Sequence, residues 1–421
     1  MDRIVIEGGI PLSGKVEISG AKNAALPLMA ASILTDDKLT LTNTPDLADI
    51  GSMRRLLQTL GVEATHPAGE PKHLTLHCAE VLSATASYEL VRKMRASVLV
   101  MGPLVARHGE ARVSMPGGCA IGTRPIDFHL QGLERLGAQI ELEEGYVRAT
   151  APNGLVGAEI RLAQPSVGAT ENLLMAACLA RGETTITPAA REPEIVDLAA
   201  CLRKMGAVIE GDGTDSIRIQ GVPRLGGCSH EVMPDRIEAG TYTMATAITG
   251  GDVQLVNGRL SLLGEAQQRL LDAGIILEEQ AEGYRVSVKN GLVSGVDVIT
   301  QPFPGFATDL QAQFMTLMCV AEGAAMITET IFENRFMHVP ELMRMGAKIT
   351  VHGGSALVRG VPQLKGAPVM ATDLRASVSL VLAGLAASGQ TEVNRVYHLD
   401  RGYEHLETKL GALGARIERV P

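Results

Sequence analysis

Aromatic side chains are scarce in this sequence, and tryptophan is absent. Phenylalanine and tyrosine make up only 3% of the 421 residues, so a hydrophobic core must consist of aliphatic side chains and methionine. The scarcity removes the stacking surfaces on which single-stranded nucleic acids bind. The formal net charge of −9 also argues against general nucleic-acid binding, which needs a basic surface. A single cationic pocket is still compatible with this charge balance.

Paired cysteine and histidine motifs are missing as well. The six cysteines include no C-x-x-C pair, and the ten histidines show no H-E-x-x-H or similar spacing. Three of the cysteines, Cys178, Cys201 and Cys319, lie in apolar, helix-like segments. We therefore predict reduced thiols in a cytoplasmic protein, with neither a disulfide framework nor a metal site.

Long apolar runs are absent too. The longest, such as residues 378–387, are too short to span a bilayer. Residues 1–7 alternate like a strand and lack the basic region and long apolar stretch of a signal peptide. We predict no contact with a membrane.

A phrase of an apolar residue followed by glycine recurs six times. Its glycines are about seventy residues apart, which indicates internal repetition. They are Gly61, Gly137, Gly206, Gly274, Gly346 and Gly414. Each is expected to end a helix in the left-handed conformation that glycine favours.

The residues around each glycine repeat in pattern. An amphipathic helix precedes it, as in 128–136 and 195–205, and a hairpin follows, as in 139–142 paired with 146–149. A second helix, rich in small apolar residues, lies further upstream and should be buried. We predict such helices at 24–33, 171–180, 242–248, 310–320 and 374–386.

This pattern predicts an α/β fold built from six strand–helix–strand–helix–hairpin units. Six copies fit two domains of three units better than one sheet, with the buried helices inside and the sheets outside. The first strand precedes any helix of its own, so we assign it to the second half of the chain. The predicted domains are residues 22–232, and residues 1–21 together with 233–421, with a cleft between them.

The stretch at residues 116–125 (PGGCAIGTRP) combines a thiol and a cation with three glycines and two prolines. Glycine and proline disfavour regular structure, so we predict an exposed loop. Cysteine is usually buried, and Cys119 on such a loop points to chemistry. Its ordinary pKa of about 8.5 suits a proton donor, whereas the nearby Arg124 would favour a nucleophilic thiolate. An idle thiol is the third interpretation.

Basic residues also gather at the joints between the units. They are Lys22, Arg95, Arg124, Arg335, Arg375 and Arg401. Arginine binds phosphate and carboxylate with two parallel hydrogen bonds, and helix N-termini predicted near Asn23, 167–168 and 308–309 would add backbone donors. The alternative is that each is a surface ion-pair partner. Asp309 and Asp373 each open a predicted helix, so each is either an N-cap or a group at the cleft, Asp309 being a candidate general base.

Several phrases together resemble the UDP-N-acetylglucosamine enolpyruvyl transferases of the EPSP synthase superfamily. They are residues 20–24 (GAKNA), 116–119 (PGGC), 191–197 (REPEIVD), 234–238 (PDRIE), 333–342, 371–377 and 400–404. The resemblance runs nearly end to end and implies a pair of inside-out α/β barrels. It also implies transfer of the enolpyruvyl group of phosphoenolpyruvate to the 3′-hydroxyl of UDP-N-acetylglucosamine, by addition and elimination with release of phosphate. This is the first committed step of peptidoglycan synthesis, and no metal or cofactor is implied.

The same resemblance implies roles for individual residues. Cys119 is similar to the family's proton donor, which can form a covalent adduct with phosphoenolpyruvate and is alkylated by fosfomycin, and Asp309 to the base facing the sugar hydroxyl. Lys22, Arg124 and Arg401 resemble the phosphoenolpyruvate-binding cations, with Asn23 beside them and Arg335, Asp373 and Arg375 in support. The UDP-sugar side resembles Arg95, Arg124, Pro125, Ile126, Asp127, Phe128, Gln164, Pro165, Ser166, Val167, Asp309 and Ile331. Gln164 and Pro165 depart from the family's pattern.

Two rival functions are compatible with parts of the sequence. One is 5-enolpyruvylshikimate-3-phosphate synthase, which has the same fold and chemistry but lacks the cysteine loop. The other is a non-catalytic paralogue that binds a nucleotide sugar, against which the intact Lys22, Cys119, Asp309 and Arg401 argue. In the favoured interpretation, the anionic substrates drive the cleft to close and exclude water, and they keep Cys119 protonated by offsetting the nearby cations.

Overall fold

The computed structural model describes residues 2–115, 126–288 and 291–421. Within these ranges the chain divides into two compact units. Of the described residues, those between Gly20 and Met233 form one unit, called the 20–233 unit, and the N-terminal residues up to Ser19 form the other together with Pro234–Pro421. The described strands form six four-stranded sheets, three in each unit. In every sheet one edge strand pairs in parallel and the other two pairings are antiparallel.

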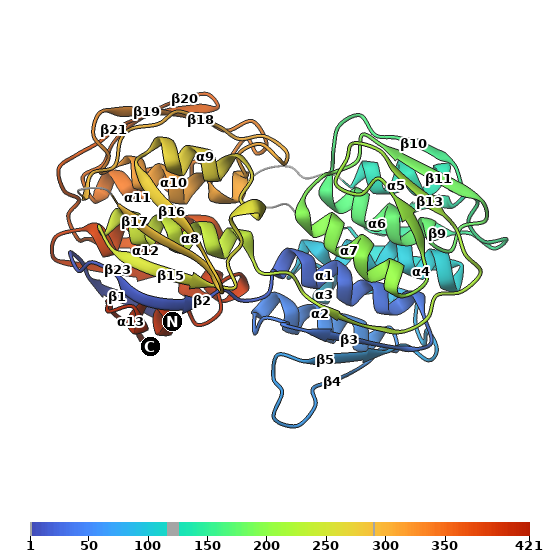
Figure 1. Ribbon diagram of the computed structural model, residues 1–421. Coiled ribbons are helices and arrows are strands. Elements are labelled where there is room, and N and C mark those ends of the chain that lie inside the picture. The colour runs from blue at the N-terminus through green and yellow to red at the C-terminus, as the bar shows by residue number, and fades with distance from the viewer. Residues whose placement is uncertain (1, 116–125, 289–290) are drawn as a thin grey trace. The chain divides into compact units, whose positions relative to one another are not determined.

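The 20–233 unit holds three of these sheets (Figure 1). The first orders β14 (Cys228–Glu231), β3 (Lys38–Thr42), β5 (Leu74–His77) and β4 (Glu63–Thr65). The second orders β6 (Thr85–Ala86), β7 (Glu110–Ser114), β9 (Tyr146–Thr150) and β8 (Gln139–Glu143). The third orders β10 (Glu159–Arg161), β11 (Glu183–Thr187), β13 (Ile217–Gln220) and β12 (Val208–Glu210).

The helices of this unit differ in how deeply they are buried. In α1 (Lys22–Ala31) every residue but Asn23 is buried, and in α6 (Val167–Ala177) every residue after Gly168 is buried, whereas the others expose one face. The others are α2 (Ala48–Thr59), α3 (Tyr88–Val91), α4 (Met101–His108), α5 (Asp127–Arg135) and α7 (Pro193–Lys204). Two short 3₁₀ segments, η1 (Ser32–Leu34) and η2 (Arg95–Val100), adjoin α1 and α4.

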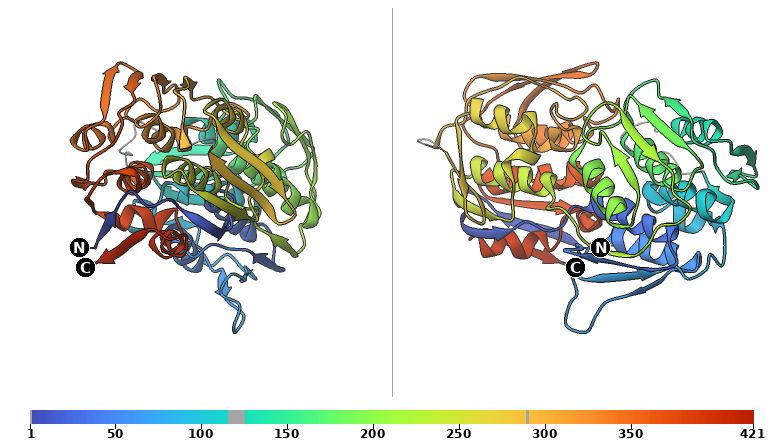
Figure 2. Two further views of the ribbon diagram at one scale, coloured as in Figure 1. Left: turned by 60° about the vertical axis from the view of Figure 1, so that its left-hand side comes forward. Right: turned by 45° about the vertical axis from the view of Figure 1, so that its right-hand side comes forward.

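The other unit contains both ends of the chain. Its first sheet orders β22 (Pro368–Met370), β23 (Gln390–Asn394), β1 (Arg3–Glu7) and β24 (Arg416–Val420). The second orders β16 (Ile275–Gln280), β17 (Gly283–Val288), β15 (Asp252–Val256) and β2 (Ser13–Glu17). The third orders β18 (Val298–Ile299), β19 (Ala324–Thr328), β21 (Ser355–Arg359) and β20 (Lys348–His352). β1 pairs with β23 on one side and β24 on the other. The N- and C-termini therefore lie side by side, as both views in Figure 2 show.

Three helices that pack against one another form the interior of this unit: α8 (Arg236–Ile248), α10 (Gln311–Met318) and α12 (Leu374–Ala386). Every residue of α8 is buried. The core of this unit is mainly aliphatic, and Tyr242, Tyr284 and Phe314 are among its few aromatic side chains, as the low aromatic content of the sequence predicts. The more peripheral helices are α9 (Glu265–Asp272), α11 (Val339–Arg344) and α13 (Leu406–Ala412), with 3₁₀ segments η3 (Leu260–Leu262), η5 (Thr308–Leu310) and η6 (Val396–Arg401).

The α/β class with mixed sheets is confirmed, and so are several local predictions. The hairpin of β8 and β9 forms as expected, and α12 has the predicted bounds. All six recurring glycines have φ values from +87° at Gly274 to +106° at Gly61, in the left-handed region. The five described cysteines are free thiols. Across the described residues, none of the helices has the length and hydropathy needed to cross a membrane.

The predicted ends of the buried helices were partly wrong. The helix expected at 242–248 begins at Arg236, and the one expected at 171–180 begins at Val167. In both cases a capping side chain, Asp235 or Ser166, starts the helix before its apolar pattern begins. At the other end, the helices expected at 24–33, 171–180 and 310–320 finish early, at Ala31, Ala177 and Met318.

Candidate functional site

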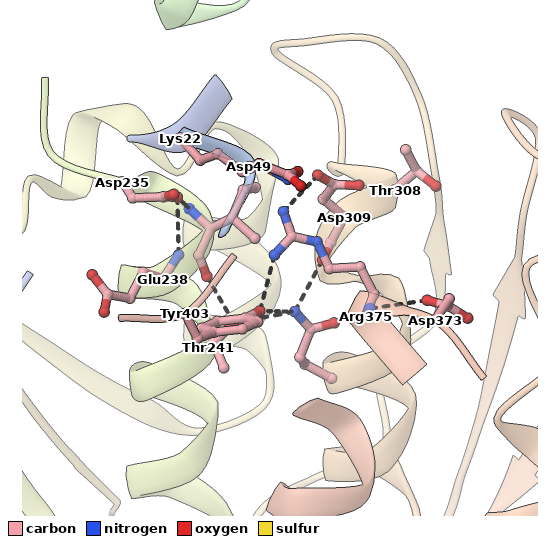
Figure 3. A network of polar contacts seen from close by, with 12 residues as sticks. Lys22, Asp49, Asp235, Glu238, Thr241, Thr308, Asp309, Asp373, Arg375 and Tyr403 are labelled. Carbon is pink, nitrogen blue, oxygen red and sulfur yellow. Dashed lines mark hydrogen bonds and ion pairs between the residues drawn. The ribbon is translucent and has the colours of Figure 1, made fainter. Parts of the chain in front are cut away.

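Asp309 lies in η5, where the chain enters the buried helix α10. Its Oδ1 accepts a hydrogen bond from Arg335 Nη2 at 2.6 Å, and its Oδ2 accepts one from Arg375 Nη2 at 2.8 Å. The two arginine side chains are 5% and 6% exposed, whereas the carboxylate side chain is 27% exposed. Asp309 caps no helix, so the N-cap interpretation of this residue is wrong. The arrangement holds an accessible carboxylate between two buried cations, of which Figure 3 shows Arg375.

The two guanidinium groups determine the charge of Asp309. Burial opposes ionisation, but Arg375 and Arg335 outweigh it through their charges and hydrogen bonds, so the pKa of Asp309 lies well below its usual range. Burial likewise disfavours the charge of Arg375, yet Asp309 raises the pKa of that guanidinium. The site therefore contains an anionic carboxylate at neutral pH, able to accept a hydrogen bond or a proton.

Glu329 supports Arg335 through Thr308, and no sequence pattern points to this glutamate. Its Oε2 accepts from Thr308 Oγ1 at 2.9 Å, and Thr308 Oγ1 in turn accepts from Arg335 Nη1 at 2.8 Å. Its Oε1 accepts from Thr300 Oγ1 and from the backbone N–H groups of Ile331 and Phe332. Glu329 thus fixes both the arginine beside Asp309 and the backbone at Ile331, another predicted site residue.

A second buried set orients Arg375 from the opposite direction (Figure 3). Arg375 Nη1 donates to the hydroxyl of Tyr403 at 3.1 Å, and that hydroxyl lies 3.0 Å from Thr241 Oγ1 on α8. Gln313 Nε2 donates to Tyr403, Thr241 and the carbonyl of Asp309. Tyr403 falls within the phrase at 400–404, but nothing in the sequence paired it with Arg375.

The remaining predicted residues of this unit occupy element ends. Asp373 is the N-cap of α12, accepting from the backbone N–H groups of Arg375 at 2.9 Å and Ala376 at 3.1 Å. The capping interpretation of this aspartate is confirmed. Arg401 is the last residue of η6 and is half-buried.

In the 20–233 unit, Lys22 begins α1 and is buried. Its Nζ lies 3.3 Å from Oδ2 of Asp49 on α2, and both side chains are almost fully covered. The half-buried Asn23 follows it. Lys22, Arg335 and Arg375 do have ion-pair partners, as the alternative interpretation held, but that interpretation was wrong in placing them on the surface.

Three predicted segments of the UDP-sugar side come together around Asn172 of α6. Its Oδ1 accepts from the N–H of Gly102, and its Nδ2 donates to the carbonyl of Val98 and to Nδ1 of His129. These contacts join η2, which begins at Arg95, to α5 and α6. Burial, reinforced by the charge of Arg95, lowers the pKa of His129 to about 3, so this ring is neutral.

The predicted nucleotide-side residues sit at the starts of those helices. Ile126 precedes α5, and Asp127 and Phe128 are its first residues. Ser166 caps α6 by accepting from the N–H of Ala169, and Val167 begins the helix, while Gln164 and Pro165 are exposed. Cys119, Arg124 and Pro125 lie outside the described residues.

Comparison with known proteins gives matches along the whole chain. The family described as EPSP synthase (3-phosphoshikimate 1-carboxyvinyltransferase) matches residues 6–410. The UDP-N-acetylglucosamine 1-carboxyvinyltransferase of Rhodospirillum centenum is 63% identical over 428 residues, with 100% of this chain and 99% of that protein covered. Those of Dinoroseobacter shibae and Granulibacter bethesdensis are 61% and 63% identical, each with 100% of this chain and 99% or more of the relative covered.

Solved structures are similar over the same length. The enolpyruvyl transferase NikO from Streptomyces tendae superposes with a TM-score of 0.89 at 26% identity, covering 100% of this chain and 99% of that one. EPSP synthase from Acinetobacter baumannii gives a TM-score of 0.78 at 20% identity, covering 100% of both chains, which shows a shared fold.

Proposed function

Since the chain belongs to the EPSP synthase family, and within it to the UDP-N-acetylglucosamine 1-carboxyvinyltransferases, we propose that it transfers the enolpyruvyl group of phosphoenolpyruvate to the 3′-hydroxyl of UDP-N-acetylglucosamine. Phosphate is released, and the product commits the sugar to peptidoglycan synthesis. The observation that carries this assignment is the 63% identity to a transferase of that name over the full length of both chains. A cytoplasmic location is part of the proposal, because phosphoenolpyruvate is a metabolite of the cell interior.

The proposal also covers the finer architecture. It takes the fold as a pair of inside-out α/β barrels, with residues 22–232 in one domain and residues 1–21 plus 233–421 in the other. Support comes from the three sheets of each unit, which share one pairing pattern, and from α8, which is buried along its whole length.

Asp309 is the proposed base for the sugar hydroxyl. Its low pKa keeps it ionised, so it can accept the proton at any pH near neutrality. The same low pKa makes it a weak base, because the strength of a general base follows its pKa. The proton therefore moves as the new C–O bond forms, when the hydroxyl becomes acidic, and Arg335 and Arg375 keep the carboxylate aimed during that step.

The other reacting groups are assigned as follows. Cys119 donates a proton to the methylene carbon of phosphoenolpyruvate and can bond covalently to that substrate. Lys22, Arg124 and Arg401, with Asn23, bind the phosphate and carboxylate of phosphoenolpyruvate, since cations concentrate anionic substrates. Loss of phosphate from the tetrahedral adduct, together with loss of a proton from its new methyl group, then restores the double bond. The reaction needs no redox or metal chemistry from the protein.

The decisive test measures phosphate release from phosphoenolpyruvate with UDP-N-acetylglucosamine or shikimate 3-phosphate as acceptor. We expect release only with the UDP-sugar, and a loss of about 100-fold or more in Cys119→Ala and Asp309→Ala. Cys228→Ala, on strand β14, removes a thiol that has no part in the proposed reaction, so it serves as the matched control and should retain activity. Release with shikimate 3-phosphate alone would identify the rival synthase, and none with either acceptor would identify a non-catalytic paralogue.

A further inference from the structure

Two cysteines meet where α7 packs against β14 in the 20–233 unit. Cys201 Sγ lies 3.9 Å from Cys228 Sγ, although the two residues are 27 positions apart in the sequence. Cys201 is completely buried, whereas Cys228 is half-buried. Neither belongs to the proposed reaction or to the groups that position its residues.

The two thiols are neighbours because side chains that are two apart on a strand, or three or four apart on a helix, face the same way. Cys228 and His230 are two apart on a strand and share one face. Asp197, Cys201 and Lys204 are four and three apart on a helix and share one side. A polar contact lies next to the thiols: His230 Nε2 is 3.0 Å from Asp197 Oδ1, and His230 Nδ1 is 3.3 Å from Lys204 Nζ. The packing of α7 on β14 is thus fixed without a covalent bond.

A disulfide needs the sulfur atoms about 2.05 Å apart, so the gap between them must shorten by roughly 2 Å. Rotation of the two side chains about their own bonds is a movement of that size. The hydrogen bond from the Cys201 thiol, together with nearby His230 and Lys204, outweighs burial and lowers the pKa of Cys228 below its ordinary value. Since the thiolate is the reactive form, the less buried of the two thiols is also the better nucleophile.

We propose that Cys201 and Cys228 form an oxidation site that closes to a reversible disulfide on exposure to a mild two-electron oxidant such as hydrogen peroxide. The Cys228 thiolate attacks one peroxide oxygen, which breaks the O–O bond and gives a sulfenic acid and, after protonation, water. The Cys201 sulfur then attacks the Cys228 sulfur, the S–O bond breaks, and a second water leaves. Two thiols and one peroxide thus become one disulfide and two waters.

The position gives the bond a structural consequence. β14 is the last strand of its unit, and the chain leaves the unit at Met233, soon after it. The backbone N–H of Met233 already lies 3.5 Å from Oδ2 of Asp197 on α7. A disulfide between α7 and β14 would tie this exit segment covalently to the helix.

The test uses the full-length protein and identifies the bonds directly. The protein is treated with hydrogen peroxide, its remaining thiols are alkylated, and its peptides are mapped by mass spectrometry without reduction. We expect a linked pair of peptides that contain Cys201 and Cys228, lighter by two hydrogens, with loss of their alkylated forms. Dithiothreitol should restore both thiols. Cys201→Ala should leave Cys228 as a sulfenic acid that a dimedone probe labels, and Cys228→Ala should leave Cys201 unmodified.

Two results would overturn the proposal. In one, both thiols remain alkylatable while Cys119 is oxidised. In the other, Cys228 is oxidised but links only to a second molecule. Cys178, which is fully buried, provides an internal reference because it should stay reduced throughout. Since no readout uses catalysis, failure here would leave the proposed transferase activity untouched, and failure of that activity would leave this site untouched.

Discussion

At the level of single residues, the Asp309 group shows how charges are kept in a covered site. Two cationic side chains that are 5% and 6% exposed would be costly to bury alone. The carboxylate between them offsets most of that cost and is itself kept ionised. Three charges therefore hold one another in place, and each of them influences the proton affinity of the others.

Removing one cation should make Asp309 a stronger base and shift its titration. In Arg335→Gln, one of the two groups that stabilise the carboxylate is gone, so the pKa of Asp309 rises. In the unmodified protein, any fall of kcat/KM with decreasing pH that occurs above about pH 4 should come from the titration of groups other than Asp309. In the variant a new limb should appear at higher pH, with a lower kcat. The measurement is the pH profile of phosphate release.

Arg344→Gln provides the matched control, because that arginine side chain is 58% exposed and contacts Glu341 and the carbonyl of Pro368, not Asp309. Its pH profile should overlay that of the unmodified enzyme. An unchanged acidic limb in Arg335→Gln would contradict the electrostatic role assigned to Arg335.

Glu329→Gln tests the support behind the arginine. Glu329 Oε1 carries the contacts to Thr300, Ile331 and Phe332, and an amide oxygen can keep them. Only the Oε2 contact to Thr308 and the negative charge are lost. We expect kcat/KM to fall about tenfold, which corresponds to about 1.4 kcal/mol of lost transition-state stabilisation, while the fold is kept. Steady-state kinetics alongside the exposed control Glu322→Gln would measure this, and equal values for both variants would refute it.

At the level of elements, helix starts are set by side chains that apolar patterning overlooks. Asp235 Oδ1 accepts from the backbone N–H groups of Ile237 at 2.8 Å and Glu238 at 3.1 Å and so begins the fully buried α8. An N-cap contributes about 1 kcal/mol to stability. The helix that bears Thr241, and through it Tyr403, depends on this cap.

Asp235→Ala should lower the free energy of unfolding by about 1 kcal/mol or more, because two N–H groups inside the protein lose their acceptor. Asp235→Asn should lose much less, since its amide oxygen can still cap the helix. Urea titrations of both variants would measure the difference. Equal losses would mean that the charge of Asp235, rather than its capping bonds, stabilises α8.

The sequence predicted elements well where one local pattern defines them. The apolar run of α12 and the turn between β8 and β9 needed only neighbouring residues, and their prediction was confirmed. The ion pairs of Asp309 could not be predicted from the sequence, because its two arginines are 26 and 66 positions away. No pattern in the neighbouring residues distinguishes a capping aspartate such as Asp373 from one that is paired with cations far away in the sequence. The roles of Cys119 and Arg124 remain predictions.

At the level of the whole molecule, one buried group ties three distant parts of the chain together. Glu238 on α8 accepts from the backbone N–H of Ser19 at 2.7 Å and from Lys409 Nζ on α13 at 2.8 Å. Ser19 Oγ also donates to Glu404 at 2.5 Å. The first twenty residues and the last twenty are thus fastened to the middle of the sequence.

This group should make stability depend on pH. Burial, opposed by Lys409, raises the pKa of Glu238 to about 7, above the value of about 4.3 expected in an unfolded chain. Between these two values the folded state holds the proton more tightly, so its stability falls as pH rises. The loss should be roughly 3 kcal/mol between pH 4 and pH 8.

Glu238→Gln cannot titrate, so its unfolding free energy should fall less steeply over that range, even though its stability at pH 5 is lower. The measurement is a series of urea titrations from pH 5 to pH 8 on both proteins. Parallel curves for the two proteins would show that Glu238 does not titrate in this window.

The pairing of β1 with β24 also constrains how the protein is made. A ribosome releases residues in order, so the sequence of the 20–233 unit is complete when the other unit has only its residues up to Ser19. β1 is synthesised first, yet its partners β23 and β24 come last, and Ile4 and Ile6, which are fully buried in the finished protein, have no sheet to join until then. During synthesis the nascent chain must carry an unpaired, apolar first strand past a folded neighbour, a state in which chaperones would find a binding segment.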